Sequence, residues 1–420
     1  MKIFVLIVFL SAYLFLILRR GRQFFVLVAA IAILFLGRAI SFKDIISSIN
    51  YNVLGVFLGT MVLSSLFIYS GCPAYFATKL VEGSKNVGGA LLSLCVLSGA
   101  ISAFVENVAT VLIIAPIAFE VANKLKVNPV PLLIGISISS NLQGCATMIG
   151  DSPSIILALS SGMNFMDFFW MKARPGIAFA VELGALTSFF VLYLIFKKYK
   201  QAVKNIEKVE VKTFFPLVLL VMMMVTLAIS SFIKNKSDYS IAFICIFFGL
   251  IGLFWHQLQH RESISLVKDL DWHTFFLLIG IFVLVGSLNV NGIIKDISNY
   301  LIRITKGNKF FAYTIIVWLS VFLSSFIDNI PYTVAMIPVT KLVAISFGIS
   351  PEPFLFGLLI GTCLGGNITP IGASANIVAC GLLKKHGYEV RFKEFIKIGL
   401  PFTLVAVATA YIFIWLVWAR

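Results

Sequence analysis

Long apolar stretches recur along the whole chain, and several approach the ~20 residues that a helix needs to cross a hydrocarbon core. They do not alternate apolar and polar residues, as the strands of a membrane barrel would. The pattern therefore predicts an all-α polytopic membrane protein. The stretches cover residues 1–18, 24–40, 51–71, 88–105, 108–122, 130–161, 174–196, 214–232, 241–258, 273–292, 310–327, 353–383 and 400–418.

Two of these stretches carry the same polar interruption. "FVENVATVLIIAP" begins at Phe104, and "FIDNIPYTVAMIP" begins at Phe326, 222 residues later. At this constant offset residues 102–155 match residues 324–377 without a gap, with 18 identities in 54 positions. The identities include three prolines, an asparagine and three glycines, which shared apolar composition would not align in one register. The chain therefore contains an internal repeat.

The number of crossings between the copies determines their relative orientation. If residues 88–125 form a hairpin that enters and leaves on one side, five full crossings separate the copies, and the second copy is inverted. We expect about ten crossings, two re-entrant hairpins and two broken helices, with both termini outside. Inverted-topology repeats are typical of secondary transporters.

The same pattern predicts how the chain is divided. Residues 1–50 and 214–272 would form transmembrane helices of a scaffold, joined to the rest by a basic cytoplasmic linker at 197–213. Repeat 1 spans residues 51–196, with a hairpin at 88–125 and a broken helix at 130–161, and repeat 2 spans residues 273–420, with a hairpin at 310–347 and a broken helix at 353–383.

Composition and charge support a membrane protein. The 420 residues are 60% hydrophobic and 12% charged, with a mean hydropathy of +1.01. The net charge of +15 comes mainly from short loops, where the positive-inside rule explains it, so we expect contact with lipid headgroups and not with nucleic acid. Arg19, Arg20 and Arg22 would be cytoplasmic, whereas the cations between Lys295 and Lys309 would lie outside. Six scattered cysteines without a C-x-x-C spacing predict neither disulfide nor metal site.

The last stretch of each copy is interrupted by small and polar residues at mid-membrane depth. The first reads "SSNLQGCATMIGDSPSII" from Ser139, and the second reads "GTCLGGNITPIGASANIV" from Gly361. Backbone groups freed by such a break are costly in lipid unless they line a cavity or are buried in protein. The N-termini of half-helices also suit anions. Ser152 before Pro153 predicts a helix N-cap, and Ser374 would cap the second copy. We interpret the breaks as binding sites.

Acidic residues lie at both hairpin tips and in one break. Glu106 and Asp328 would occupy the tips, and Asp151 lies in the first break, with Ala373 at the equivalent position of the second. Ionisable residues inside a membrane cost roughly 2.5–3.5 kcal/mol, so they need a watery cavity or an ion. Carboxylates and amides offer oxygen ligands to Na⁺, and burial favours the neutral carboxyl, which suits H⁺. The alternative is a buried pair with a lysine such as Lys341.

Other classes of membrane protein have weaker support. "GASA" at 372–375 resembles the G-x-S-G of rhomboid proteases but ends in alanine, and "MIGD" at 148–151 lacks the first glycine of the intramembrane aspartyl protease motif. The chain has no H-E-x-x-H and no Walker A motif, so we predict no enzyme activity and no direct use of ATP. A channel stays an alternative, although ionisable residues at the hairpin tips favour coupled transport.

The hairpin and break motifs resemble those of the ion transporter superfamily. That group includes metal–citrate and dicarboxylate symporters, arsenite/antimonite efflux proteins, D-type Na⁺/H⁺ antiporters and the melanosomal P protein. In arsenite-efflux and P-protein-like members the breaks commonly read G-D-P-P-N and G-A-S-A-N. Residues 372–376 match the second pattern, whereas Ser152 and Ser154 replace the usual proline and asparagine of the first. The resemblance implies a homodimer, with a transport region that moves against a scaffold, and Asn107, Asn329, Thr147 and Thr369 lining the site.

The resulting hypothesis is a multi-pass secondary transporter of the cytoplasmic membrane for a small inorganic or organic anion or an oxyacid, coupled to Na⁺ or H⁺, with no other cofactor. No arginine in the motifs could clamp a carboxylate, so arsenite/antimonite efflux and Na⁺/H⁺ antiport without an organic substrate stay open. The predicted coupling-ion ligands are Glu106, Asn107, Asp151, Asp328 and Asn329. The predicted substrate-binding residues are Thr147, Ser152, Ser154, Asn367, Thr369, Ser374 and Asn376.

Overall fold

The computed structural model describes residues 1–18, 23–124, 126–203, 209–260 and 263–419. The first half contains α1 (Lys2–Leu18), α2 (Gln23–Leu36), α3 (Phe42–Ser48), α4 (Tyr51–Tyr69), α5 (Cys72–Glu82), α6 (Val87–Ser102), α7 (Asn107–Lys124), α8 (Pro129–Gly144), α9 (Ser152–Ser160) and α10 (Ile177–Phe196). A short 3-10 helix (Phe165–Phe168) and an antiparallel hairpin of β1 (Trp170–Met171) and β2 (Arg174–Pro175) connect α9 to α10.

The second half repeats this order of helices. It contains α11 (Phe215–Ser230), α12 (Ser240–His260), α13 (Ser263–Lys268), α14 (Trp272–Val290), α15 (Ile293–Thr305), α16 (Lys309–Ser324), α17 (Asn329–Ser346), α18 (Glu352–Gly365), a 3-10 turn (Gly366–Ile368), α19 (Ser374–Lys385) and α20 (Phe392–Trp418). The starts of α6 and α16, of α7 and α17, and of α9 and α19 are each 222 residues apart. The offset seen in the sequence is therefore also the offset between equivalent helices.

Equivalent side chains begin equivalent helices. Asn86 Oδ1 accepts a hydrogen bond from the N–H of Gly89 at 2.8 Å, and Asn308 Oδ1 accepts one from the N–H of Phe311 at 3.0 Å. Such a cap satisfies one of the N–H groups that the first turn of a helix leaves without a partner. The first arm of each hairpin thus starts by the same local mechanism.

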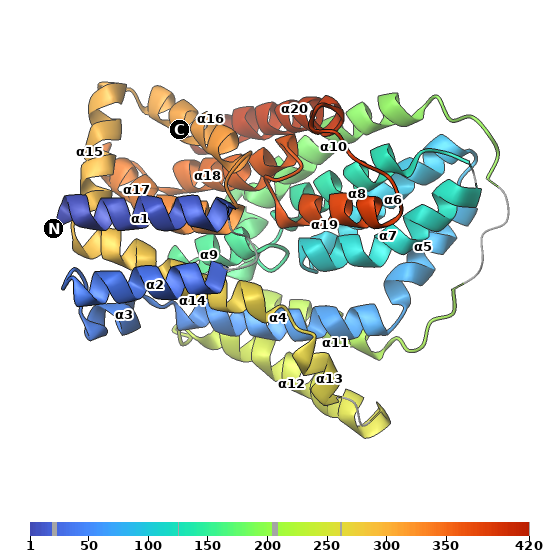
Figure 1. The fold of residues 1–420 in the computed structure, drawn as a ribbon, viewed down its shortest axis with the longest axis horizontal. Helices are drawn as coiled ribbons and strands as arrows, with labels where there is room; N and C mark the ends of the chain where they lie inside the picture. Colours follow the sequence, from blue (N-terminus) through green and yellow to red (C-terminus); the bar gives the residue numbers. More distant parts are fainter. Residues whose placement is uncertain (19–22, 125, 204–208, 261–262, 420) are drawn as a thin grey trace.

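The two copies face opposite ways along the long axis of the molecule. Hairpin α6–α7 lies in the right half of the view and hairpin α16–α17 in the left half, and most helices run along this axis (Figure 1). Six of the described helices, α4, α7, α10, α12, α14 and α20, are long and apolar enough to span a membrane. The prediction of an all-α polytopic membrane protein with inverted repeats is confirmed.

Both expected helix breaks are present. Residues 145–151 separate α8 from α9, and non-α-helical residues 366–373 separate α18 from α19. The predicted caps are wrong by one residue: Asp151 and Ala373 adopt the extended N-cap conformation, while Ser152 and Ser374 are already helical. Neither cap residue makes a side-chain capping hydrogen bond to the first turn of its helix.

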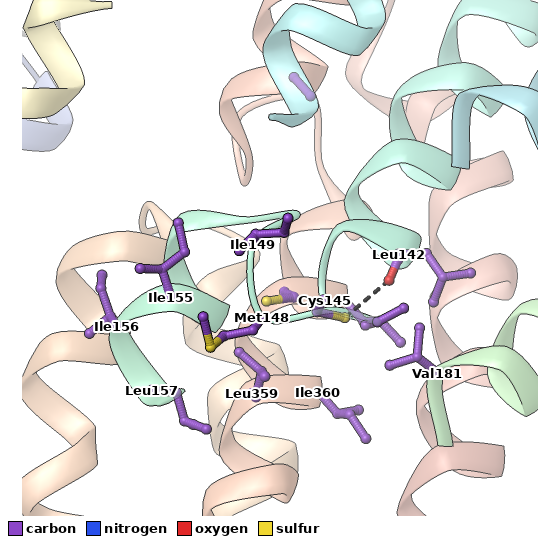
Figure 2. Close-up of a cluster of buried hydrophobic side chains, with 14 of the residues drawn as sticks. Leu142, Cys145, Met148, Ile149, Ile155, Ile156, Leu157, Val181, Leu359 and Ile360 are labelled. Carbon is purple, nitrogen blue, oxygen red and sulfur yellow. Dashed lines mark hydrogen bonds between the residues drawn. The ribbon is translucent and has the colours of Figure 1, made fainter. Parts of the chain in front are cut away.

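The first break is embedded in an apolar cluster. Leu142, Met148 and Ile155 come from α8, the break and α9, and they pack beside Val181 of α10 and Leu359 of α18 (Figure 2). The Sγ of Cys145 donates to the carbonyl of Leu142 at 3.0 Å (Figure 2). Because this packing excludes water, polar atoms in the break need partners within the protein or a bound solute.

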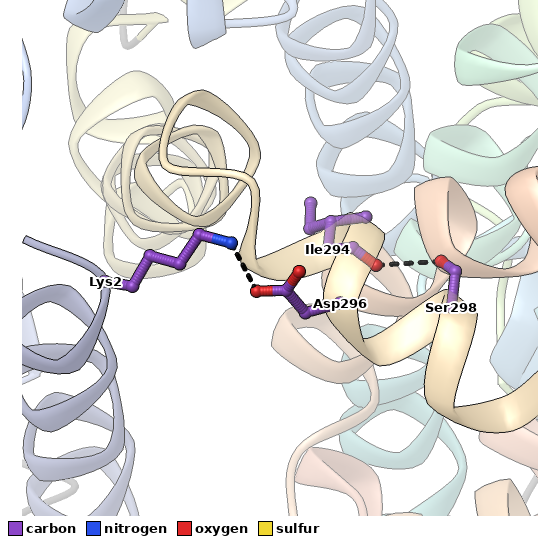
Figure 3. Close-up of polar contacts among 4 residues, drawn as sticks. All are labelled: Lys2, Ile294, Asp296 and Ser298. Carbon is purple, nitrogen blue, oxygen red and sulfur yellow. Dashed lines mark hydrogen bonds and ion pairs between the residues drawn. The ribbon is translucent and has the colours of Figure 1, made fainter.

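Helix α15 lies across the end of the bundle that holds the N-terminus (Figure 1). Lys2 Nζ lies 2.6 Å from Asp296 Oδ2, while Ser298 Oγ donates to the carbonyl of Ile294 (Figure 3). The cations between Lys295 and Lys309 are therefore at the same end as the N-terminus. The predicted cytoplasmic residues Arg19, Arg20 and Arg22 lie outside the described residues, as do Lys204 and Lys208 of the linker.

Candidate functional site

Each hairpin tip is closed by a serine–asparagine contact. Ser102 Oγ donates to Asn107 Oδ1 at 2.6 Å, and Ser324 Oγ donates to Asn329 Oδ1 at 2.6 Å. The serine ends the first arm, and the asparagine begins the second. Both pairs are buried, where a hydrogen bond is strong and an unpaired amide would be costly. The contact therefore fixes where the amide nitrogen of each asparagine points.

The tips are also joined to the breaks. Thr147 Oγ1 donates to the carbonyl of Ala103, and Thr369 Oγ1 donates to the carbonyl of Ser325. The backbone of the first break approaches the first tip so closely that position 150 requires glycine. A Cβ on Gly150 would lie 2.6 Å from the carbonyl oxygen of Ala103. Each tip and its break thus form one hydrogen-bonded unit.

The two tip acids lie at the N-termini of the returning arms. Glu106 Oε2 accepts hydrogen bonds from the N–H groups of Val108 at 3.0 Å and Ala109 at 3.1 Å. Asp328 Oδ1 accepts one from the N–H of Ile330 at 3.1 Å. The partial positive charge of a helix N-terminus favours such carboxylates. Lys341, the lysine considered as a partner for Asp328, instead donates from Nζ to the carbonyl of Ser160 at the end of α9.

A cavity of about 220 Å³ lies between the two tips. All five predicted coupling-ion residues line it, together with Ser152 and Ser374. Ser374 Oγ also donates to Asp328 Oδ2 at 3.3 Å, which links the second break to its tip. The structure therefore brings acids, amides and helix N-termini from both repeats to one space.

Two further cavities adjoin this one and share lining residues with it. The first, of about 200 Å³, shares Asp328 and Ser374 and reaches Tyr13 of α1. The second, of about 480 Å³, shares Glu106 and Asp151 and reaches α4. The central cavity thus adjoins one cavity that is lined by α1 and another that is lined by α4.

The other five predicted substrate-binding residues do not line this cavity. They are all buried, and they are Thr147, Ser154, Asn367, Thr369 and Asn376. Asn141 Nδ2 donates to Asn367 Oδ1 at 2.8 Å and to Asn376 Oδ1 at 3.0 Å, which ties α8 of the first repeat to the second break. Thr147 and Thr369 make the tip contacts described above. Ser154 is fully buried, and its Oγ has no hydrogen-bond partner among the described residues.

Four further polar residues of the cavity lining did not emerge from the sequence: Asn141, Asp271, His273 and Thr274. Asp271 caps α14, since its Oδ1 accepts the N–H of Thr274 at 3.0 Å and its Oδ2 accepts the hydroxyl at 2.6 Å. In the sequence this segment is a polar start to an apolar run, typical of a loop at the membrane surface. Only the packing of α14 beside the tips places it at the cavity.

The cavity has an acidic lining. Four carboxyl groups, those of Glu106, Asp151, Asp271 and Asp328, face it together with one imidazole, that of His273. Its lining, all of which belongs to the described residues, contains no lysine or arginine. Charges in a space of low dielectric interact strongly, so cations are attracted and a free anion is repelled until these acids are neutralised.

Comparisons with known proteins agree with this architecture. A family model described as "Citrate transporter" matches residues 12–361. An uncharacterized transporter of Mycobacterium tuberculosis is 29% identical over 374 residues, which cover 88% of this chain and 87% of the relative. The P protein of Mus musculus is 27% identical over 465 residues, which cover 90% of this chain and 55% of the P protein.

Solved transporter structures share the fold. The YdaH transporter of Alcanivorax borkumensis superimposes with a TM-score of 0.62 at 13% identity, covering 89% of this chain and 88% of that one. MtrF of Neisseria gonorrhoeae, described as one of a class of antimetabolite efflux pumps, gives a TM-score of 0.58 at 12% identity, covering 89% and 82%. At these identities the likeness extends to the fold alone.

Proposed function

The chain belongs to the citrate transporter family, and we propose that it is a secondary active transporter that moves a small anion or oxyacid across the cytoplasmic membrane, coupled to Na⁺ or H⁺. The observation that carries the proposal is the cavity where both hairpin tips meet, because it combines ion-binding acids with helix N-termini. A site between inverted repeats near mid-membrane is where such transporters bind solute.

The charges of the cavity favour an ordered mechanism. Four carboxyl groups with one histidine disfavour an anion on its own. A coupling cation or proton must therefore bind first and neutralise Glu106, Asp151 or Asp328. The anion can then accept hydrogen bonds at the N-termini of α9 and α19, beside Ser152 and Ser374.

The scaffold and the moving part follow from the same contacts. Helices α6–α10 and α16–α20 would form a transport region. The tips, the breaks and the asparagine contacts join α6–α9 to α16–α19, while Gln143 of α8 donates to Glu182 of α10 and Thr187 of α10 contacts Thr409 of α20. Helices α1, α2, α4, α11, α12 and α14 would form the scaffold, and α1 and α14 line the cavities from the other side. Dimerisation through the scaffold would hold it still while the transport region moves.

A second candidate is a Na⁺/H⁺ antiporter without an organic substrate. The specific observation in its favour is the acidic cavity lining, which contains no guanidinium or ammonium group to bind a carboxylate. Efflux of arsenite, a neutral oxyacid, is compatible with the same lining because it needs no cationic ligand.

Purified protein in proteoliposomes separates these functions. Na⁺ and pH gradients are imposed separately, with and without citrate, dicarboxylates or arsenite, while solute uptake and internal pH are recorded. Gradient-driven accumulation of an anion or oxyacid is the expected result. Proton flux driven by Na⁺ that is unchanged by every solute would replace the proposal with the antiporter.

A further inference from the structure

Helix α15 crosses the end of the bundle, whereas most helices run along the long axis (Figure 1). One face of α15 packs on the protein, since Ile294, Ser298 and Thr305 are buried. Ser298 Oγ lies 3.5 Å from the carbonyl oxygen of Val339 in α17. These contacts fix how α15 is rotated about its own axis, and therefore which residues it turns away from the protein.

A second face of α15 is apolar but exposed. Ile297, Tyr300 and Ile304 have exposed fractions of 38%, 66% and 41%. Their i, i+3, i+7 spacing places them along one side of the helix, and we call them the apolar stripe. Apolar surface of this kind is unfavourable in water, so the stripe requires an apolar cover.

A third face of α15 is polar and basic. Its exposed residues recur every four positions, and they are Lys295, Asn299 and Arg303. Residues three apart are neighbours on a helix surface, so Arg303 lies next to Tyr300 of the apolar stripe. The basic face therefore borders the apolar stripe along the helix.

The positive charge continues beyond the end of α15 and is poorly neutralised by the chain itself. Lys306 and Lys309 are also exposed, and Asp296 is the only acid between residues 293 and 327. Lys2 Nζ lies 2.6 Å from Asp296 Oδ2 (Figure 3). The cations of this segment thus exceed its acids, and its acid already has a partner in α1.

The expected orientation gives no reason for these cations. It places them outside, whereas the positive-inside rule enriches Lys and Arg in cytoplasmic loops. A basic face beside an apolar stripe is instead typical of a helix that lies in the membrane interface. In such a helix the apolar side chains enter the acyl region, and Lys and Arg extend toward headgroup phosphates. Tyrosine is common at this depth because one end of its ring is polar.

We propose that α15 lies in the membrane interface and binds anionic phospholipid, with the apolar stripe among the acyl chains and Lys295, Arg303 and Lys306 at the headgroups. Helix α15 joins α14 to α16, the first arm of the second hairpin. Anionic lipid therefore holds the segment that connects the hairpin to the preceding span. This contact does not depend on which solute the protein transports.

Fluorescence quenching by brominated lipids tests the contact in the full-length protein. Tyr300→Trp places a reporter in the apolar stripe, and its signal is the excess over the wild type, which has six tryptophans. Vesicles contain equal amounts of phosphatidylcholine and phosphatidylglycerol, and only one of the two lipids is brominated on its acyl chains. We expect brominated phosphatidylglycerol to quench the reporter at least about twofold more strongly than brominated phosphatidylcholine.

Two sets of substitutions in the reporter protein locate the charges responsible. Lys295→Gln, Arg303→Gln and Lys306→Gln together should abolish the preference for phosphatidylglycerol while both brominated lipids still quench. The matched control removes three exposed cations from α19 and α20, through Lys384→Gln, Lys385→Gln and Lys393→Gln, and should keep the preference. All these side chains are exposed, so melting temperatures in detergent should stay close to that of the reporter protein.

Four outcomes overturn the inference. Equal quenching by the two lipids would remove the selectivity for anionic headgroups. Absence of quenching by either lipid would place the apolar stripe in water or against a second protein chain. A preference that survives the substitutions in α15, or that the control substitutions abolish, would assign it to other residues. None of these measurements involves transport, so the inference and the proposed function can fail separately.

Discussion

At the scale of single residues, both asparagines at the hairpin tips make the same contact, but their surroundings differ in charge. Asn107 lies near Asp151, whereas Asn329 lies near Ala373, and only Asp328 supplies a carboxylate to the second tip. Function at the second tip should therefore depend strongly on this one acid.

Asp328→Asn is expected to lower coupled transport by at least about tenfold, a loss of roughly 1.4 kcal/mol, while the melting temperature stays close to that of the wild type. The amide keeps the shape of the side chain but removes its charge. Gradient-driven uptake in proteoliposomes measures the effect. The matched control is Asp296→Asn, because the Lys2–Asp296 pair is more than half exposed and such pairs contribute about 0–1 kcal/mol. Wild-type transport by Asp328→Asn would contradict the assignment.

His273 is the one cavity residue that can carry a positive charge beside the anion. His273→Gln should raise the KM for the transported anion severalfold and leave the maximal rate nearly unchanged, since it removes an attraction that acts equally on bound and moving anion. Uptake measured over a range of anion concentrations separates the two parameters. A fall in maximal rate at constant KM would indicate a structural role for His273.

At the scale of elements, the breaks persist because glycines allow backbones to meet. Gly150 sits among the carbonyls of the tip and of α8, so any side chain there would push the tip away from the break. The break between α8 and α9 is therefore maintained by packing against the hairpin tip. The glycine in the local sequence allows this packing but does not produce the break by itself.

Gly150→Ala is expected to destabilise the protein by roughly 1–3 kcal/mol, the usual cost of forcing an extra methyl group into a packed site. It should also reduce transport, because the tip loses its position over the cavity. Thermal unfolding in detergent measures the first effect. Gly381→Ala in α19 is the control, since a Cβ there meets nothing within 4 Å. Equal melting temperatures for the two variants would show that the carbonyls can move aside.

At the scale of the whole molecule, the two repeats meet along α10 and α20. Thr187 and Thr409 are 222 residues apart, and their hydroxyl oxygens lie 3.1 Å from each other. Equivalent residues in direct contact mark the pseudo-twofold axis that relates the repeats. Both helices belong to the proposed transport region, so they should move together.

A disulfide between Thr187→Cys and Thr409→Cys tests that rigid movement. The short distance between the native oxygens makes the pair accessible to oxidation. Oxidised protein in proteoliposomes is expected to keep most of its transport activity, and each single variant controls for the substitution. Loss of transport on oxidation, restored by reduction, would mean that α10 and α20 move relative to each other.

The repeat, its 222-residue offset and the positions of the hairpins and breaks could all be predicted from the sequence, because prolines, glycines and acids inside apolar runs are locally distinctive. The caps were wrong by one residue, since Ser152 and Ser374 are favourable N-cap types that the chain uses at the next helical position. Local preferences place an element but do not fix its first residue.

The sequence by itself determined the membrane class, the inverted repeat and the acids that a bilayer would not tolerate without a role. Only the tertiary structure decided that Asp271 and His273 line the cavity and that Lys341 donates to the carbonyl of Ser160. It also decided that Asn376 bridges the second break, whereas the hydroxyl of Ser154 in the first has no partner among the described residues. The physical reason is the distance along the chain over which each effect acts. Hydrophobic patterning and helix breaking depend on residues that are close together in the sequence. The partner of a buried polar atom is instead set by packing between segments hundreds of residues apart.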